Sequence, residues 1–416
     1  MKEIFIKYIK NNLGLINLFG KISGRFLFLL LTSFFAYKLS FKDFASFAIF
    51  WTTTRMFTFF SANNLYIIYF NEVRESLTVG HSWPAKVSFN IFSTAVVFGV
   101  VSTIFSFFIF DSWLIAFIMF PSLLSFVVIR NISEFSKADN SVYLSIFIED
   151  FLFYFIFFVT GVASVYLYSS LLGIVIALLI TVLITAIVSL ILFRRKFKIK
   201  IKSFKLVVST FSFKDLKLGV NYTILRGNEF LSSFGVRYLG QIYFGDIFVS
   251  YAHIMYQFYN LFTLVTMSVI SGMQSEITVK DSFVLNNIFF KQMYFKVLKT
   301  VSPFVFGIIL VIAVFNTYIL NLFFPKYIQY GPLLVKISFT GLLFMIIQPL
   351  VFILIYNNKV TSIRLLNMAQ YTAITLIYLI PFIFPKFNEQ YWLLMSMTIF
   401  IIIQGGFSFF SYNKIK

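Results

Sequence analysis

The sequence predicts an all-α polytopic membrane protein with about 12 transmembrane helices. Of its 416 residues, 60% are hydrophobic and only 12% are charged, and the mean hydropathy is +0.90. Soluble domains carry about 25% charged residues, so the composition excludes a soluble protein. The apolar stretches continue to the C-terminus, which excludes a signal peptide or a single anchor as the main membrane segment. Their length indicates helices, because the strands of a membrane barrel are short and alternate in polarity.

Apolar windows of about 19 residues divide the chain into two groups of six spans. The N-terminal group covers 15–37, 46–69, 87–110, 113–135, 142–167 and 170–193. The C-terminal group covers 217–238, 248–273, 297–323, 332–356, 361–384 and 391–411. We therefore expect an N-terminal lobe over 1–193, a basic cytoplasmic linker over 194–216 and a C-terminal lobe over 217–416.

The basic residues are spread unevenly over the connections between these spans. With the N-terminus inside, the inner connections, with Arg130 counted among them, hold 24 of the 34 Lys+Arg residues. The outer connections hold only five, which are Lys38, Lys42, Arg237, Lys326 and Lys386. Cytoplasmic loops are enriched in basic residues, so we expect both termini to be cytoplasmic. The same placement argues against nucleic acid as a partner, because the basic run 194–205 faces anionic membrane lipid.

A short repeat marks the same place in each half. The sequence FASFA at 44–48 opens the second span, and FVSYA at 248–252 opens the eighth. Each follows a short turn with an acidic residue, Asp43 in the first half and Asp246 in the second. Six spans return the chain to its starting side, so the two lobes are expected to be parallel repeats around a central cavity.

Five basic residues fall inside the predicted spans: Lys21, Arg25, Arg55, Arg226 and Lys336. A charge near the centre of a membrane helix costs about 2.5–3.5 kcal/mol on insertion scales, so these side chains are expected to face protein or water. A net-cationic cleft that binds substrate explains them economically. Two alternatives remain open: Lys336 extends to the outer surface, and Arg226 forms an internal ion pair with Glu229, three residues further on.

The acidic residues inside the spans are Glu149, Asp150 and Glu229. They are candidates for ion coupling, and Glu149 and Asp150 are alternatively counter-ions for Arg130 or an arginine of the cleft. The threonines Thr52, Thr53 and Thr54, with Asn63 and Asn64, make the second span polar and are expected to form inter-helix hydrogen bonds.

The residues needed for several kinds of chemistry are missing from the sequence. The absence of cysteine and the presence of only two histidines exclude a Cys/His metal site and thiol catalysis, and nothing indicates a cofactor. Membrane enzymes that polymerise lipid-linked sugars need a long outer loop, whereas the outer connections here are about a dozen residues or shorter. We therefore do not expect an enzyme. A cationic cleft in an apolar body suits an anionic lipid, such as a prenyl-pyrophosphate-linked sugar.

Two segments resemble bacterial polysaccharide exporters of the MOP superfamily, the Wzx-type O-antigen and capsule repeat-unit flippases. They are NLFGKISGRFLFLLLTSFFAYKLSFKDFASFAIF at 17–50 and YILNLFFPKYIQYGPLLVKIS at 318–338. The resemblance implies two six-helix lobes that translocate undecaprenyl-pyrophosphate-linked oligosaccharides by alternating access across the bacterial inner membrane. It matches Lys21 and Arg25 to basic positions of the family's first helix, while Arg55 and Arg226 fit its cavity by depth.

Partners and alternative functions follow from the same resemblance. A flippase of this kind works beside a polysaccharide polymerase and a chain-length regulator, which are therefore the expected protein partners. The alternatives are a membrane-embedded polysaccharide polymerase or ligase and a MATE-type cation-coupled drug antiporter. The antiporter would favour acidic and aromatic cleft residues, and the enzyme is opposed by the short outer connections.

Overall fold

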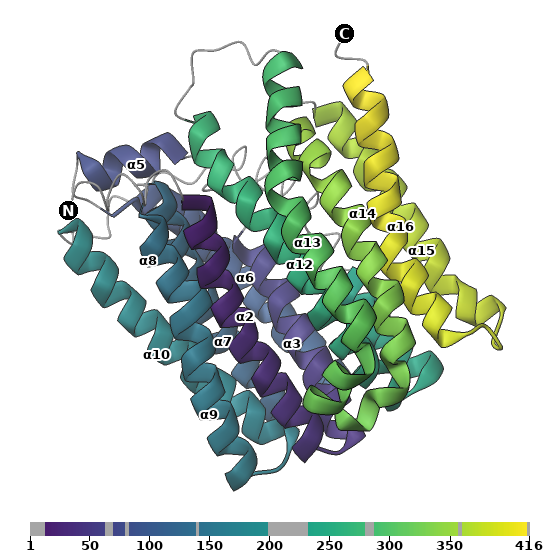
Figure 1. The fold of residues 1–416 in the computed structure, drawn as a ribbon. Coiled ribbons are helices and arrows are strands. Elements are labelled where there is room, and N and C mark those ends of the chain that lie inside the picture. The colour runs from purple at the N-terminus through teal and green to yellow at the C-terminus, as the bar shows by residue number, and fades with distance from the viewer. Residues whose placement is uncertain are drawn as a thin grey trace. The chain divides into compact units, whose positions relative to one another are not determined.

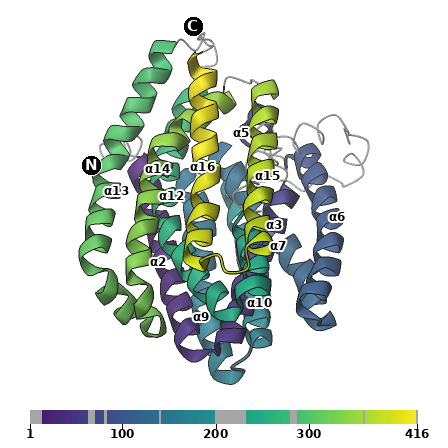
Figure 2. The same ribbon diagram turned by 90° about the vertical axis from the view of Figure 1, so that its right-hand side faces the viewer.

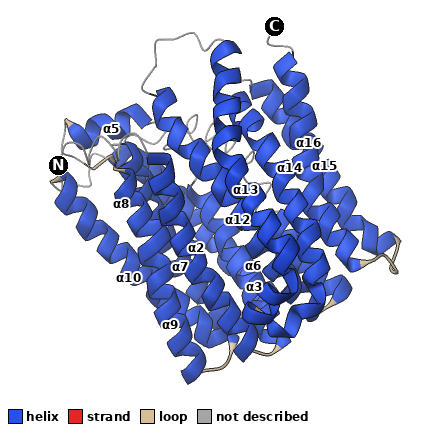
Figure 3. Cartoon of the chain, viewed as in Figure 1, coloured by secondary structure: helices blue, strands red, loops and turns tan. Residues whose placement is uncertain are grey.

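A computed structural model describes residues 13–62, 70–79, 83–138, 141–198, 232–278, 287–356 and 360–413. Within these ranges the chain is helical with short connections, and none of the described residues forms a β-strand (Figure 3). Each predicted span other than 217–238 corresponds to a helix. Span 217–238 and the linker 194–216 lie largely outside the described residues, although Arg194–Phe197 extends the preceding helix.

Eight helical stretches among the described residues are long and apolar enough to cross a membrane. They are Val87–Phe110, Trp113–Lys137, Tyr143–Leu167, Leu171–Phe197, Lys291–Phe323, Pro325–Val351, Leu365–Ile383 and Glu389–Ser408. Many of their large apolar side chains point outward, as in Phe108 with 76% exposure and Phe382 with 73%. A lipid surrounding accounts for such exposure, because hydrocarbon takes the place of water around these side chains. The prediction of an all-helical, multi-pass membrane protein is therefore confirmed.

The described residues form two compact units. The first unit consists of 26–31 and 46–230, and the second of 1–25, 32–45 and 231–416, in each case the part that the structure describes. The helices α2 (Leu13–Lys38) and α3 (Phe41–Ala62) each contribute residues to both units.

The first unit is built around α7 (Trp113–Ala138). Its other helices are α5 (Phe70–Thr78), α6 (Ala85–Phe110), α8 (Val142–Ile146), the π-helix η1 (Phe147–Leu152), α9 (Phe153–Leu167) and α10 (Leu171–Phe197). The helix α7 packs against α6, α10, α8 and η1 (Figure 1). Aromatic rings join α3 to α9, since Trp51 and Phe157 stack with centroids 5.7 Å apart and an interplanar angle of 9°.

The second unit is built around α14 (Gly331–Tyr356). Its other elements are the helical segment 232–244, α12 (Asp246–Thr278), α13 (Asn287–Phe323), the 3₁₀ turn η4 (Pro325–Tyr330), α15 (Val360–Ile383) and α16 (Glu389–Asn413). The helix α14 packs against α12, α13 and α16, and α15 packs against α16 (Figure 2). Trp392 lies fully buried in this unit and donates a hydrogen bond from Nε1 to the Ile377 carbonyl over 2.8 Å.

The repeat segments FASFA and FVSYA occupy matching places at the starts of helices. Residues 44–48 follow the first turn of α3, and residues 248–252 follow the start of α12. Before α3, the Ser40 hydroxyl accepts a hydrogen bond from the Asp43 N–H over 3.1 Å, which caps the helix. Before α12, Gly245 has a φ of +85°, a conformation that glycine adopts without steric cost. The local chemistry of the two turns thus differs while the placement of the repeat is the same.

Close helix packing in the second unit depends on Gly341 of α14. A Cβ atom at this position would lie 2.3 Å from Cγ of the buried Phe262 on α12. We expect Gly341→Ala to force α12 and α14 apart and to destabilise the protein by about 1–3 kcal/mol. The measurement is the apparent melting temperature of the purified protein in detergent. Gly406→Ala is the matched control, because nothing lies within 4 Å of its added Cβ, and equal melting of the two variants would contradict the prediction.

Candidate functional site

A polar pocket lies inside the first unit. It is lined by Arg55, Thr58, Phe126, Ile129, Arg130, Glu149 and Phe153. These residues come from α3, α7, η1 and the start of α9. Two arginines and one glutamate line the pocket, so its charged side chains carry a net positive charge.

The three charged residues of the pocket lie at similar distances from the described ends of their helices. Arg55 lies seven residues before the end of α3, Arg130 lies eight residues before the end of α7, and Glu149 lies seven residues after the start of α8. At 1.5 Å per helical residue, each is roughly 10–12 Å from the helix end that the positive-inside pattern assigns to the cytoplasm. Arg130 and Glu149 lie in two helical stretches that are long and apolar enough to cross a membrane.

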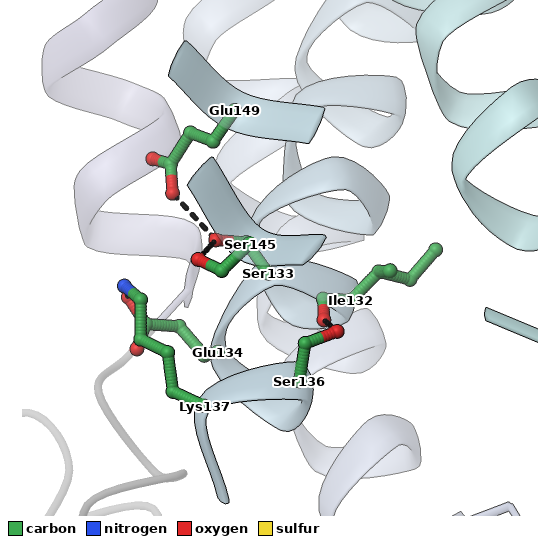
Figure 4. Close-up of polar contacts among 7 residues, drawn as sticks. All are labelled: Ile132, Ser133, Glu134, Ser136, Lys137, Ser145 and Glu149. Carbon is green, nitrogen blue, oxygen red and sulfur yellow. Dashed lines mark hydrogen bonds and ion pairs between the residues drawn. The ribbon is translucent and has the colours of Figure 1, made fainter. Parts of the chain in front are cut away.

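One serine hydroxyl bonds the Glu149 carboxylate, and a second serine contacts the first (Figure 4). Ser133 Oγ donates a hydrogen bond to Glu149 Oε2 over 2.7 Å, and Ser133 Oγ and Ser145 Oγ are 2.6 Å apart. Glu149 belongs to the π-helix η1, which interrupts an otherwise α-helical span. A π-helical turn changes the rotation of the residues that follow, and such turns occur often at functional sites.

Positive charges surround the Glu149 carboxylate. Lys137, Arg130 and Arg55 all attract it electrostatically. Lys137 also forms an ion pair with Glu134, with Nζ and Oε1 2.9 Å apart. Figure 4 shows the Lys137 amine next to the Glu134 carboxylate on α7. The prediction that Glu149 acts as a counter-ion for Arg130 or a cleft arginine agrees with this arrangement.

Each pocket arginine also lies near an aromatic ring of α3. Cζ of Arg55 is 5.8 Å from the centroid of Trp51, and Cζ of Arg130 is 5.1 Å from the centroid of Phe59. An aromatic face attracts a guanidinium and partly replaces its water of hydration. The rings and Glu149 together stabilise the two arginines in an apolar environment.

The other predicted site residues are distributed over both units. Lys21 and Arg25 are half-buried on α2. Asp150 is half-buried in η1, next to Glu149, but does not line the pocket. Lys336 is exposed on α14, with Nζ 5.4 Å from the centroid of Tyr391.

The prediction that Arg226 and Glu229 form an ion pair or line a cleft lies outside the described residues. The structure therefore brings together Arg55 and Glu149 from the predicted set.

Two basic residues assigned to connections lie inside helices instead. Arg130, counted with the inner connections, is part of α7 and lines the pocket. Its position within the apolar run 113–135 is the signal that identifies it as an intramembrane residue. Arg237, counted with the outer connections, is buried in the helical segment 232–244, which continues six residues beyond the predicted end at 238.

Close packing accompanies this longer helix. A Cβ at Gly240 would lie 2.2 Å from Phe248 Cε1, so only glycine allows the approach.

The threonines of α3 correct a further expectation. The Thr53 and Thr54 hydroxyls donate to the carbonyls of Ile49 and Phe50 over 2.8 and 2.9 Å, and Thr52 bonds in the same way to Ala48. The expected inter-helix hydrogen bonds are therefore wrong for Thr52 and Thr53, because a hydroxyl at this position reaches the carbonyl four residues earlier in its own helix. Thr54 also contacts Met119 Sδ on α7 over 3.3 Å.

No protein-family model and no curated protein sequence matches the chain. The chain does match solved structures of membrane transporters. The inward-facing conformation of a multidrug resistance MATE family transporter of the MOP superfamily aligns with a TM-score of 0.64 at 12% identity, covering 94% of this chain and 95% of that one. A MATE structure in the straight conformation gives 0.64 at 12% identity over 96% and 95% of the two chains.

A third structure is a MOP superfamily transporter from Pyrococcus furiosus, for which reverse polarity of the binding pocket suggests a different function. It aligns with a TM-score of 0.59 at 12% identity over 96% of this chain and 94% of that one. The agreement extends over nearly the full length of each chain, while the identities are too low to carry function across. The chain therefore has the helical fold of the MOP-superfamily transporters.

Proposed function

We propose that this protein is a flippase that moves undecaprenyl-pyrophosphate-linked oligosaccharide repeat units across the bacterial inner membrane, for O-antigen or capsular polysaccharide. The observation that carries the proposal is the placement of Arg55 of α3 and Arg130 of α7 in one pocket, where α7 is a helix long and apolar enough to cross a membrane. Guanidinium groups bind pyrophosphate oxygens through paired hydrogen bonds, which makes a phosphorylated lipid a suitable ligand.

The transporter fold supports alternating access as the mechanism. In this mechanism the pyrophosphate pairs with basic residues in the protein while the prenyl tail remains in the surrounding lipid. Lys21, Arg25, Arg226 and Lys336 are proposed as further contacts for the anionic head group. The rings of Phe28 and Trp51 stack with centroids 4.6 Å apart. Arg25 lies one helical turn before Phe28, and Arg55 lies one helical turn after Trp51.

Glu149 is proposed as the ion-coupling residue of the flippase. We expect Glu149→Gln to preserve the fold, because glutamine still accepts the Ser133 hydrogen bond, but to remove the response to a proton or sodium gradient. The measurement is the rate at which labelled sugar enters the surface polysaccharide, with and without an ionophore. Glu134→Gln is the control acidic substitution on the neighbouring helix. An unchanged response in Glu149→Gln would assign the carboxylate a purely structural role.

The function is tested in a deletion strain of the host by locating lipid-linked oligosaccharides. Complete repeat units that accumulate on the cytoplasmic leaflet would mean that translocation has failed, as a flippase requires. Single units that accumulate on the outer leaflet would mean that translocation works and polymerisation fails. The second result would replace the flippase with the polymerase or ligase function.

A MATE-type drug antiporter is the second candidate, favoured by the multidrug MATE transporters among the similar structures and by the Glu149 carboxylate in the pocket. Efflux of a cationic dye such as ethidium from cells that express the protein distinguishes the two. An antiporter exports the dye in a way that depends on Glu149 and tolerates loss of Arg55. A flippase leaves dye accumulation unchanged, because two arginines in the pocket repel a cation.

A further inference from the structure

Arg237 is a second buried arginine, located in the helical segment 232–244 of the second unit. Its side chain is only 3% exposed. Nη1 donates a hydrogen bond to the Ser233 carbonyl over 2.8 Å and a second one to the Ser233 hydroxyl. Its Cζ atom lies 4.5 Å from the centroid of the Tyr256 ring on α12. Within the part of the chain that the structure describes, Nε has no hydrogen-bond partner and Arg237 forms no ion pair.

Two buried polar side chains of α12 share a helix face. His253 is fully buried and Gln257 is 7% exposed, with Gln257 Nε2 and His253 Nε2 3.2 Å apart. His253 interacts electrostatically with Arg237. Arg237 lies seven residues before the end of the segment 232–244, and His253 lies seven residues after the start of α12. At 1.5 Å per residue, both are roughly 10 Å from the turn that joins the two helices.

The groups around the Arg237 guanidinium replace its hydration only in part. One carbonyl, one hydroxyl and one aromatic face replace part of the water that a guanidinium binds, but none of them carries a negative charge. Buried arginines are ordinarily paired with a carboxylate, and an ionised side chain inside a membrane protein marks a substrate or ion pathway by default. The missing partner is therefore an anion, and the planar guanidinium favours the two oxygens of a phosphate or carboxylate.

We propose that Arg237, with His253 and Gln257, forms an anion subsite that binds a phosphoryl or carboxylate group of the transported substrate. The inference rests on the proposed function, because it requires an anionic substrate. The group comes either from the lipid pyrophosphate or from an acidic sugar of the oligosaccharide. The side chain is closed off in this structure, so the subsite fills after Tyr256 and the segment 232–244 move apart during transport.

The test measures binding to the purified full-length protein in detergent by thermal shift. Farnesyl pyrophosphate is the pyrophosphate probe, glucuronate is the acidic-sugar probe, and farnesol is the uncharged control. We expect Arg237→Gln to weaken binding at least tenfold for one of the two anions, which identifies the source of the group. Lys386→Gln removes an exposed cation of a connection and is expected to bind both probes like the wild type.

A second variant keeps the test independent of folding problems in Arg237→Gln. Ser233→Asp places a carboxylate where the Ser233 hydroxyl already contacts Arg237 Nη1. This internal anion is expected to raise the melting temperature and to weaken binding of the same probe that Arg237→Gln weakens, since it takes the place of the ligand at this subsite. Wild-type affinity for both probes in the two variants would overturn the subsite and leave Arg237 a structural residue.

The proposed function fails in a distinguishable way. If Arg55→Gln weakens farnesyl pyrophosphate binding while Arg237→Gln and Ser233→Asp leave both probes unaffected, only the subsite is wrong. If the wild type binds neither anion, the pyrophosphate-lipid function is wrong and the subsite falls with it.

Discussion

Replacing Arg55 by alanine is expected to abolish the surface polysaccharide of the host while the protein still inserts into the membrane. Removal of one partner from a buried, hydrogen-bonded charge pair costs about 2–5 kcal/mol, or roughly 30-fold to several thousand-fold in affinity. The fold should tolerate the change, because Arg130 and Lys137 remain as counter-ions of Glu149. Arg55→Lys keeps the charge without the planar fork, so an intermediate amount of polysaccharide is expected.

The measurement is surface polysaccharide per cell, normalised to the amount of protein in the membrane. Lys42→Ala is the control, because it removes an exposed cation from the start of α3. Arg130→Ala is expected to lose activity as Arg55→Ala does, since both arginines line the pocket. Normal polysaccharide in Arg25→Ala, Arg55→Ala and Arg130→Ala would contradict a cationic substrate site.

A chemical cross-link between the turn after α2 and the turn η4 is expected to stop transport completely. Residues of the second unit bring these turns together. Lys326 Nζ donates to the Leu39 carbonyl over 3.1 Å, and the rings of Phe41 and Tyr327 meet edge to face with centroids 5.8 Å apart. The Ser250 hydroxyl on α12 donates to the Phe41 carbonyl over 3.3 Å. In the predicted orientation these contacts lie at the outer end of the helices. Alternating access requires this outer end to open during the transport cycle.

The experiment uses Phe41→Cys with Tyr327→Cys and a short bismaleimide. The natural chain contains no cysteine, so only the introduced pair reacts. We expect the doubly substituted protein to support incorporation of labelled sugar before treatment and to lose it in proportion to the cross-linked fraction. The control pair Lys386→Cys and Gln390→Cys joins the connection before α16 to the first turn of that helix, so its cross-link should leave transport intact. Undiminished transport by cross-linked protein would show that these two turns do not separate during the cycle.

The spans and the helical class could be predicted from the sequence because hydrocarbon leaves the backbone no external hydrogen-bond partner. An apolar run long enough to cross a membrane must therefore satisfy its own polar groups, and a helix does so without help from the rest of the chain. The runs 87–110 and 170–193 agree with α6 and α10 for this reason. Arg55 and Glu149 could be identified as candidates in the same way, because a charge is conspicuous in an apolar run.

The meeting of Arg55, Arg130 and Glu149 was decided by the tertiary structure alone. Hydropathy reports the length of a helix but not its rotation about its axis, and the π-helix η1 changes that rotation at Glu149 itself. Arg237 shows the same limit, since it is buried against Tyr256 of the following helix α12. Composition and periodicity thus determined the helices and their membrane setting, whereas packing between distant segments determined which charges share a site.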